Sequence, residues 1–266
     1  MLKYNGKTVE INYFPDGTLL MKEVVENGEK AVITWLYENN EELLALYFLT
    51  HHIRSKGVKR IELQLPYIPN ARQDRVKAGE DVFTLKYFAK LLNSLEFEKV
   101  TVLDPHSSVS EALIDHLEIR SPKEYAERAL AKIDAECGED VLMFYPDEGA
   151  MKRYSSMFDR PYAFGIKKRD WTTGVIQGLE VSGQTERISG STVLIVDDIC
   201  SRGGTFYHSA KKLIELGAKK VYLYISHCEN KILEGELLGA GFVERVYTTN
   251  SIFTESHEKV EVFHYE

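Results

Sequence analysis

Short apolar runs rich in Val, Ile and Leu recur along the chain, separated by longer stretches with helical periodicity. Such runs are typical of buried parallel strands, and apolar positions three and four residues apart are typical of helices packed on a sheet. Predicted strands cover residues 31–37, 60–65, 100–103, 141–145, 193–196, 220–225 and 243–247, and predicted helices cover 41–55, 82–95, 109–117, 123–135, 206–216 and 229–238. This alternation predicts right-handed βαβ units and an α/β fold of doubly wound, mainly parallel sheets.

The length of 266 residues exceeds that of a typical single domain. Ser121-Pro122 separates two helical stretches and marks a boundary, because the residue before a proline disfavours the helical conformation. We therefore expect two domains, residues 1–120 and 121–266.

Composition argues against several classes of protein. The net charge of −8 disfavours a broad nucleic-acid-binding surface. No apolar run reaches the length of a membrane-spanning helix, and the first residues lack the apolar core of a signal peptide. The three cysteines are far apart and show no metal-ligand spacing, which favours reduced thiols. We expect a cytoplasmic protein without membrane or nucleic-acid partners.

The stretch that follows the predicted strand 193–196 carries the clearest chemistry. Asp197 and Asp198 end this strand, where carboxylates can accept hydrogen bonds from vicinal hydroxyls. A polar, glycine-rich turn then leads into the next predicted helix, and its backbone N–H groups favour an anion. Its residues are Ser201, Arg202, Gly203, Gly204 and Thr205. The pattern predicts a cradle for a sugar phosphate; the plainer interpretation is an acidic strand end with a simple turn.

Polar residues also end other predicted strands. Asp104 and His106 follow the strand 100–103, and Asp147 follows 141–145. Ligands of open parallel sheets bind beyond the carboxyl ends of the strands, so we expect these groups to gather with Asp197 and Asp198. His106 could equally be a structural histidine.

Three further segments are unusually polar or turn-rich. A long loop after the strand 60–65 contains Arg72, Gln73 and Arg75 and is either a binding flap or plain surface. Lys167 and Arg169 form a basic cluster that could also be a solvated turn. Residues 9–21 predict a hairpin whose Pro-Asp-Gly turn includes Asp16 and follows Phe14.

Two of these motifs resemble known families. The stretch from Val193 to Thr205 resembles the loop that binds 5-phosphoribosyl 1-diphosphate in type I phosphoribosyltransferases. Pro66-Tyr67 with Ala71-Arg72-Gln73-Asp74-Arg75 resembles a segment of ribose-phosphate diphosphokinases, and the order and spacing of the motifs agree from about Phe14 to Ile252. The resemblance implies two type I phosphoribosyltransferase-like domains, with the ATP loops in the first and the ribose-phosphate loop in the second.

The resemblance also implies an activity and its residues. The family transfers the β,γ-diphosphate of ATP to the 1-hydroxyl of ribose 5-phosphate in a reaction that requires Mg²⁺. By resemblance, ATP is bound by Phe14, Asp16, Arg72, Gln73, Arg75 and His106. The ribose phosphate is bound by Asp197, Asp198, Ser201, Arg202, Gly203, Gly204 and Thr205. The resemblance also implies that His106 and Asp147 bind the metal and that Lys167 and Arg169 are catalytic. Phe14 and Asp16 would reach adenine from a neighbouring subunit, which implies a homo-oligomer of at least two chains with a shared active site.

Two departures from the family pattern bear on specificity. Thr18 replaces a glutamate in the adenine loop, which puts selectivity for adenine in doubt. Ser201-Arg202 replaces Asp-Thr and makes the phosphate loop more cationic. Arg202 could grip a 5-phosphate more firmly, or it could neutralise a second phosphate of an acceptor such as ADP-ribose.

Two other functions compete with the diphosphokinase. A phosphoribosyltransferase would share the stretch around Asp197 but would not need Arg72 and Arg75. A non-catalytic homologue that binds nucleotide and regulates an active enzyme would not need Lys167 and Arg169, and their presence argues against it.

Overall fold

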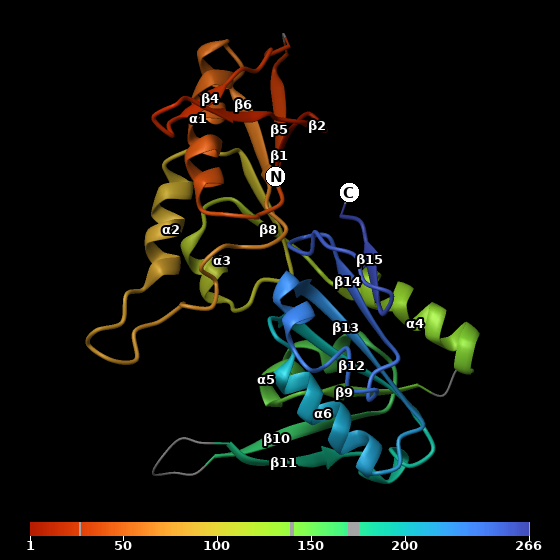
Figure 1. The fold of residues 1–266 in the computed structure, drawn as a ribbon. Coiled ribbons are helices and arrows are strands. Elements are labelled where there is room, and N and C mark those ends of the chain that lie inside the picture. The colour runs from red at the N-terminus through yellow and green to blue at the C-terminus, as the bar shows by residue number, and fades with distance from the viewer. Residues whose placement is uncertain (27, 139–140, 170–175, 266) are drawn as a thin grey trace. The chain divides into compact units, whose positions relative to one another are not determined.

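The structure is a computed structural model that describes residues 1–26, 28–138, 141–169 and 176–265. The chain forms two compact units, Met1–Ser121 and Pro122–Glu266 (Figure 1). Within the described residues, no helix is both long enough and apolar enough to cross a membrane.

The N-terminal unit is built on a six-stranded sheet of order β2-β1-β5-β6-β7-β8. Strands β5 to β8 run parallel, while β1 pairs antiparallel with β5 and β2 antiparallel with β1. Strands β3 and β4 form a separate antiparallel hairpin. The strands are β1 (Leu2–Tyr4), β2 (Lys7–Thr8), β3 (Ile11–Tyr13), β4 (Leu19–Met21), β5 (Lys30–Trp35), β6 (Arg60–Gln64), β7 (Lys99–Leu103) and β8 (Leu117–Arg120).

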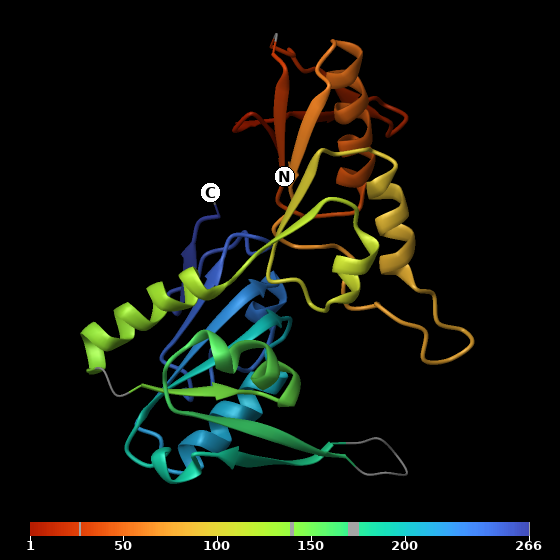
Figure 2. The ribbon, with the colours of Figure 1, turned by 180° about the vertical axis from the view of Figure 1, so that it is seen from behind.

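Three helices connect the parallel strands of this unit: α1 (Glu41–Ser55), α2 (Thr84–Asn93) and α3 (Val109–Leu113). Each crossover steps in the same direction along the sheet, so right-handed connections place all three helices on one face, as both views show (Figures 1 and 2). The core lies between this face and the helices, where Trp35, Leu46 and Ile53 are fully buried. Asn39 stabilises the start of α1, because its Oδ1 accepts from the N–H groups of Glu41 and Glu42.

The C-terminal unit is built on a seven-stranded sheet of order β11-β10-β9-β12-β13-β14-β15, parallel except for β11. Its strands are β9 (Val141–Tyr145), β10 (Tyr162–Arg169), β11 (Ile176–Gly183), β12 (Thr192–Cys200), β13 (Lys220–Cys228), β14 (Arg245–Thr249) and β15 (Val260–Phe263). Its helices are α4 (Lys123–Cys137), α5 (Glu148–Tyr154) and α6 (Gly204–Glu215), with 3₁₀ turns at Ser155–Met157, Thr185–Arg187 and Asn230–Glu234.

The strand order reverses between β9 and β12. From β9 the chain moves outward to β10 and β11, then returns to place β12 on the other side of β9. The connections through α5 and α6 therefore run in opposite directions, which puts the two helices on opposite faces of the sheet. Val193 and Ile195 pack with Phe206 and Leu213 of α6 in one core. A crevice opens at such a reversal beyond the carboxyl ends of the two strands.

The expected α/β fold with two mainly parallel sheets is confirmed. Two local predictions were wrong. The helix predicted over 229–238 is only the 3₁₀ turn Asn230–Glu234, because the backbone is extended at Gly235, with φ −92° and ψ 172°. The helix predicted over 109–117 ends at Leu113, and the chain then forms the unpredicted strand β8.

Candidate active site

Three carboxylates lie at the strand reversal of the C-terminal unit. Asp147 follows β9, while Asp197 and Asp198 lie near the end of β12. Burial is the main cause that raises the pKa of Asp197 well above its usual value, and the charges of Asp198 and Asp147 add to it. The electrostatic effect of Asp147 on Asp197 agrees with their positions after β9 and near the end of β12, two paired strands, and indicates that these two acids lie near each other.

The two acids of β12 have different surroundings. The Asp198 side chain is 7% exposed and forms an ion pair with Arg153 of α5, Nη1 to Oδ2 3.1 Å. Asp197 accepts the N–H of Asp198 at its Oδ1, 3.0 Å away. Asp147 caps α5, because its Oδ1 accepts the N–H of Ala150 at 3.1 Å. One helix, α5, thus contacts an acid at its first turn and another from its last turn.

The loop that joins β12 to α6 is supported from behind by residues 229–237, which we call the backing segment. Ser201 Oγ donates to Glu229 Oε2 at 2.6 Å, and the N–H of Glu229 donates to the Cys200 carbonyl at 2.8 Å. Gly203 has a left-handed φ of +81°, and an added Cβ there would lie 2.9 Å from Leu237 Cδ2. The loop is therefore held in one shape, with the first N–H groups of α6 following directly after it.

Arg202 is an exposed member of this loop. Its guanidinium donates to Glu234 Oε2 at 3.2 Å, and Lys231 Nζ contacts the other oxygen of Glu234 at 2.6 Å. The Arg202 side chain is 68% exposed. An exposed ion pair of this kind is weak, so a phosphate could compete for the guanidinium.

Two polar loops meet in the N-terminal unit. The loop after β6 contains Asp74, whose carboxylate is gripped by Arg75, Nε to Oδ1 2.7 Å and Nη2 to Oδ2 3.0 Å. The Arg75 hydrogen bond is the main cause that lowers the pKa of Asp74 to about 2; the charge of Arg75 and the nearby His106 lower the pKa further. The loop after β7 therefore lies against the loop after β6. Gln73 Oε1 accepts from Thr84 Oγ1 at 2.9 Å, and Arg72 is exposed.

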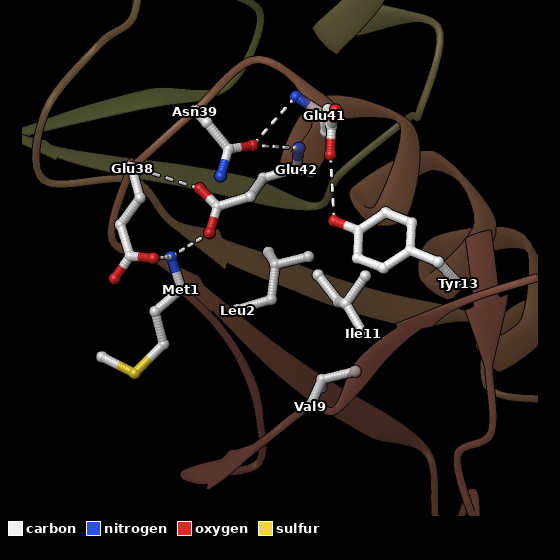
Figure 3. Close-up of a pocket in the computed structure, with 9 residues that line it drawn as sticks. All are labelled: Met1, Leu2, Val9, Ile11, Tyr13, Glu38, Asn39, Glu41 and Glu42. Atoms are coloured by element: carbon white, nitrogen blue, oxygen red, sulfur yellow. Dashed lines mark hydrogen bonds and ion pairs between the residues drawn. The ribbon is translucent and has the colours of Figure 1, made fainter. Parts of the chain in front are cut away.

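The hairpin with Phe14 and Asp16 has its own anchors. Asp16 Oδ1 accepts from the hydroxyl of Thr18 at 2.7 Å and from its N–H at 3.0 Å, and these bonds lower the pKa of Asp16. Thr18 thus stabilises the turn. Next to the turn, Tyr13 donates to Glu41 Oε2 at 2.9 Å, and both residues line a pocket of about 380 Å³ (Figure 3). The Phe14 ring is 49% exposed.

The strand β10 extends further than predicted and includes the backbone of Lys167 and Arg169. These residues pair antiparallel with Leu179 and Ile176 of β11, with a register shift between Lys168 and Arg169. Their side chains lie outside the described part of the chain.

The structure thus brings the predicted residues into separate groups within each unit. Asp147, Asp197 and Asp198 gather at the strand reversal, and His106 lies near the Asp74–Arg75 pair. Among the described residues, no three His, Cys, Asp or Glu side chains form a metal cluster. Arg153 and Glu229 contact predicted site residues but were missed, because no local pattern identifies a partner on another strand.

Comparison with known proteins identifies the family. Residues 1–95 match the family model described as the N-terminal domain of ribose phosphate pyrophosphokinase. A ribose-phosphate pyrophosphokinase of Thermococcus kodakarensis is 30% identical over 225 residues, which cover 82% of this chain and 77% of the relative. The chain belongs to the ribose-phosphate pyrophosphokinase family. The family assignment made from the motifs is therefore confirmed.

Other relatives extend the match within the ribose-phosphate pyrophosphokinase family. The Bacillus subtilis enzyme of that name is 30% identical over 235 residues, which cover 84% of this chain and 70% of the relative. The crystal structure of phosphoribosylpyrophosphate synthetase from Mycobacterium smegmatis superposes with a TM-score of 0.78 at 22% identity, over 97% of this chain and 86% of that one. At this identity the structural match supports the fold.

Proposed function

We propose that the protein transfers the β,γ-diphosphate of ATP to the 1-hydroxyl of ribose 5-phosphate, giving 5-phosphoribosyl 1-diphosphate and AMP. The observation that carries the proposal is the meeting of three acids with a glycine-rich loop at the strand reversal of a chain from this family. Such a crevice is where an open parallel sheet binds its ligand. The N-terminal unit would bind ATP, and the C-terminal unit would bind the ribose phosphate.

The loop from Ser201 to Thr205 would bind the 5-phosphate. Its backbone is fixed by the backing segment before any ligand arrives, so little conformational entropy remains to be lost on binding. Gly203 and Gly204 let the phosphate approach the backbone closely, and the N-terminus of α6 favours its negative charge. Asp197 and Asp198 would accept hydrogen bonds from the ribose hydroxyls.

The remaining predicted residues would serve the nucleotide. Arg72 and Arg75 would neutralise the triphosphate with Gln73 and His106, while Phe14 and Asp16 contact adenine. Lys167 and Arg169 would stabilise the charge that develops on the transferred diphosphate. The carboxylate of Asp147 fits Mg²⁺, which prefers oxygen ligands, with His106 as a further contact; the ion, when bound, neutralises phosphate charge.

Release of AMP tests the reaction. The protein should release AMP from ATP only when Mg²⁺ and a sugar phosphate are both present. Lys167→Ala should lower kcat by at least about 100-fold with nearly unchanged nucleotide affinity. Lys168→Ala is the matched control, since no role is assigned to Lys168. A phosphoribosyltransferase or a non-catalytic homologue would release no AMP under any of these conditions.

A second acceptor class is favoured by Arg202. This guanidinium stands at the exposed side of the phosphate loop, where it could meet a second phosphate of a 5-diphosphate ester such as ADP-ribose. Phosphorus NMR with ribose 5-phosphate and ADP-ribose as competing acceptors would identify the 1-diphosphate that forms. Turnover of ribose 5-phosphate alone would remove the second class.

The proposed shared site adds a prediction about assembly. If Phe14 and Asp16 reach the adenine of a neighbouring subunit, the active species is a homo-oligomer. Light scattering combined with activity across a dilution series should then show activity lost as the chains dissociate. A fully active monomer would contradict this part of the proposal.

A further inference from the structure

Arg153 connects the two strands at the reversal. It lies in the last turn of α5, the helix that starts from Asp147 at the end of β9, and its guanidinium reaches the carboxylate of Asp198 on β12. The Asp198 side chain is 7% exposed and that of Arg153 29%. This ion pair is better shielded from water and salt than the exposed ion pairs on the surface of the unit. The attraction between Arg153 and Asp198 is therefore stronger and holds the Asp198 carboxylate more firmly.

The position of the guanidinium is itself fixed. Tyr154 is fully buried and stacks on Tyr145 of β9 at 6.4 Å between ring centroids. Arg153 Nη1 contacts the Tyr154 hydroxyl oxygen at 3.2 Å, and its guanidinium carbon lies 5.5 Å from the Tyr154 ring centroid. The buried aromatic pair therefore ties Arg153 to β9, and Arg153 ties Asp198 to the same strand.

The first turn of α5 leaves little freedom either. The Asp147 carboxylate caps the helix through Ala150. A Cβ on Gly149 would lie only 3.1 Å from Asp147 Oδ1, so a side chain at position 149 would crowd the Asp147 carboxylate. The seven-residue helix thus acts as a short bracket that sets the spacing between the Asp147 and Asp198 carboxylates.

We propose that Arg153 is a positioning residue for the acceptor, holding the Asp198 carboxylate where it can accept hydrogen bonds from the vicinal hydroxyls of a pentose. The inference rests on the proposed function. Carboxylates at one edge of a sheet repel one another when they are ionised, and Arg153 places a positive charge beside Asp198. Without Arg153, the repulsion that its neighbours exert on Asp198 would be less well compensated, and the vicinal hydroxyls would meet a less preorganised acceptor.

Binding of the acceptor tests this role. Calorimetry with ribose 5-phosphate, and separately with ADP-ribose, would be done with Mg²⁺ and a non-hydrolysable ATP analogue present. Arg153→Met should raise the acceptor Kd by at least about tenfold and change the Kd of the analogue by less than about twofold. In turnover, KM for the acceptor should rise more than kcat falls. Arg153→Lys keeps the positive charge but lacks the planar pair of N–H donors of a guanidinium, so it should recover part of the acceptor affinity that Arg153→Met loses.

Lys152→Met is the matched control. Lys152 precedes Arg153 on α5, but its side chain is 72% exposed and pairs with Glu148 at 3.5 Å. It should bind the acceptor as the wild type does. A double-mutant cycle separates positioning from a general structural role: adding Arg153→Met to Asp198→Asn should weaken acceptor binding little further.

The possible outcomes are distinct. Equal acceptor Kd for Arg153→Met and Lys152→Met, or additive losses in the cycle, would overturn the role of Arg153 while leaving the proposed function intact. If wild-type protein binds neither acceptor, the proposed function fails and this inference with it. If Arg153→Met fails to fold, the same calorimetry on Arg153→Lys tests the inference. The inference then requires that Arg153→Lys binds the acceptor more weakly than the wild type and binds the ATP analogue equally well.

Discussion

Replacing Gly235 by alanine should displace the loop that precedes α6. A Cβ built on Gly235 lies 1.9 Å from the Arg202 carbonyl oxygen, whereas real Cβ atoms essentially never come within 3.0 Å of another heavy atom. The Arg202 carbonyl must therefore move by about 1 Å, since Gly235 is held in turn by the 3₁₀ turn before it. The backbone at φ −92° suits alanine, so the clash is the only cause of strain.

Two terms set the magnitude. Alanine at a compatible backbone position stabilises by about 0.4–1 kcal/mol through the unfolded state, while forcing an extra methyl into a packed site costs about 1–3 kcal/mol. The net loss of stability should be about 1 kcal/mol. The effect on the site should be larger, because a displacement of about 1 Å in a binding loop can cost about 100-fold in kcat/KM.

The assay compares Gly235→Ala with Gly239→Ala. Gly239 lies four residues further on, and its added Cβ would meet only the Glu236 carbonyl oxygen at an ordinary 3.9 Å. Urea denaturation followed by circular dichroism gives stability, and the KM for the acceptor reports on the loop. If Gly235→Ala and Gly239→Ala have the same acceptor KM within twofold, the loop is not supported by residues 229–237 and the reasoning fails.

Two further predictions concern pH. The pKa of Asp197 is raised, so its contribution to stability is present below its unfolded pKa of about 3.9 and is lost as the pH rises through its folded pKa. Asp197→Asn should therefore raise the thermal midpoint at pH 8, by an amount that shrinks towards pH 4, and should abolish acceptor binding; a lower midpoint at pH 8 would contradict this. The pKa of Asp74 is lowered to about 2, so its contribution is present above an unfolded pKa of about 3.9 and is lost as the pH falls towards 2. Asp74→Asn should lower stability at pH 7 by about 1 kcal/mol, allowing for its exposed Arg75 partner. The urea midpoints of wild type and variant should converge as the pH falls from about 4 towards about 2, and a constant difference would refute the assignment.

The sequence predicted those features that depend on local pattern. The buried run Val193–Val196 and the α1 helix after Asn39 lie where periodicity and capping residues placed them. The meeting of Asp147 with Asp197 followed from a general property of parallel sheets. Roles for individual residues, such as Lys167 and Arg169 in transfer, stay predictions.

Other features depend on contacts between distant segments. At Gly235 the backbone is extended, and the Arg202 carbonyl, more than thirty residues earlier in the chain, lies where a side chain on residue 235 would begin. Arg153 and Asp198 pair across two strands that are adjacent only because the chain reverses there. Helical periodicity reports which face is buried but not which side chain stands opposite, so neither contact could be read from the residues alone.

The reversal between β9 and β12 explains why acids fifty residues apart could share one substrate. The connections that follow β9 and β12 leave towards opposite faces of the sheet, and a crevice opens between them beyond the strand ends. The same geometry brings acidic side chains together, and each has a different environment. The Asp147 carboxylate accepts a hydrogen bond at the N-terminus of α5, and the Asp198 carboxylate forms an ion pair with the Arg153 guanidinium. The pKa of Asp197 is raised. Asp197 is therefore the acid whose charge depends most on what binds, because a hydroxyl donor or a cation in the crevice would stabilise its ionised form.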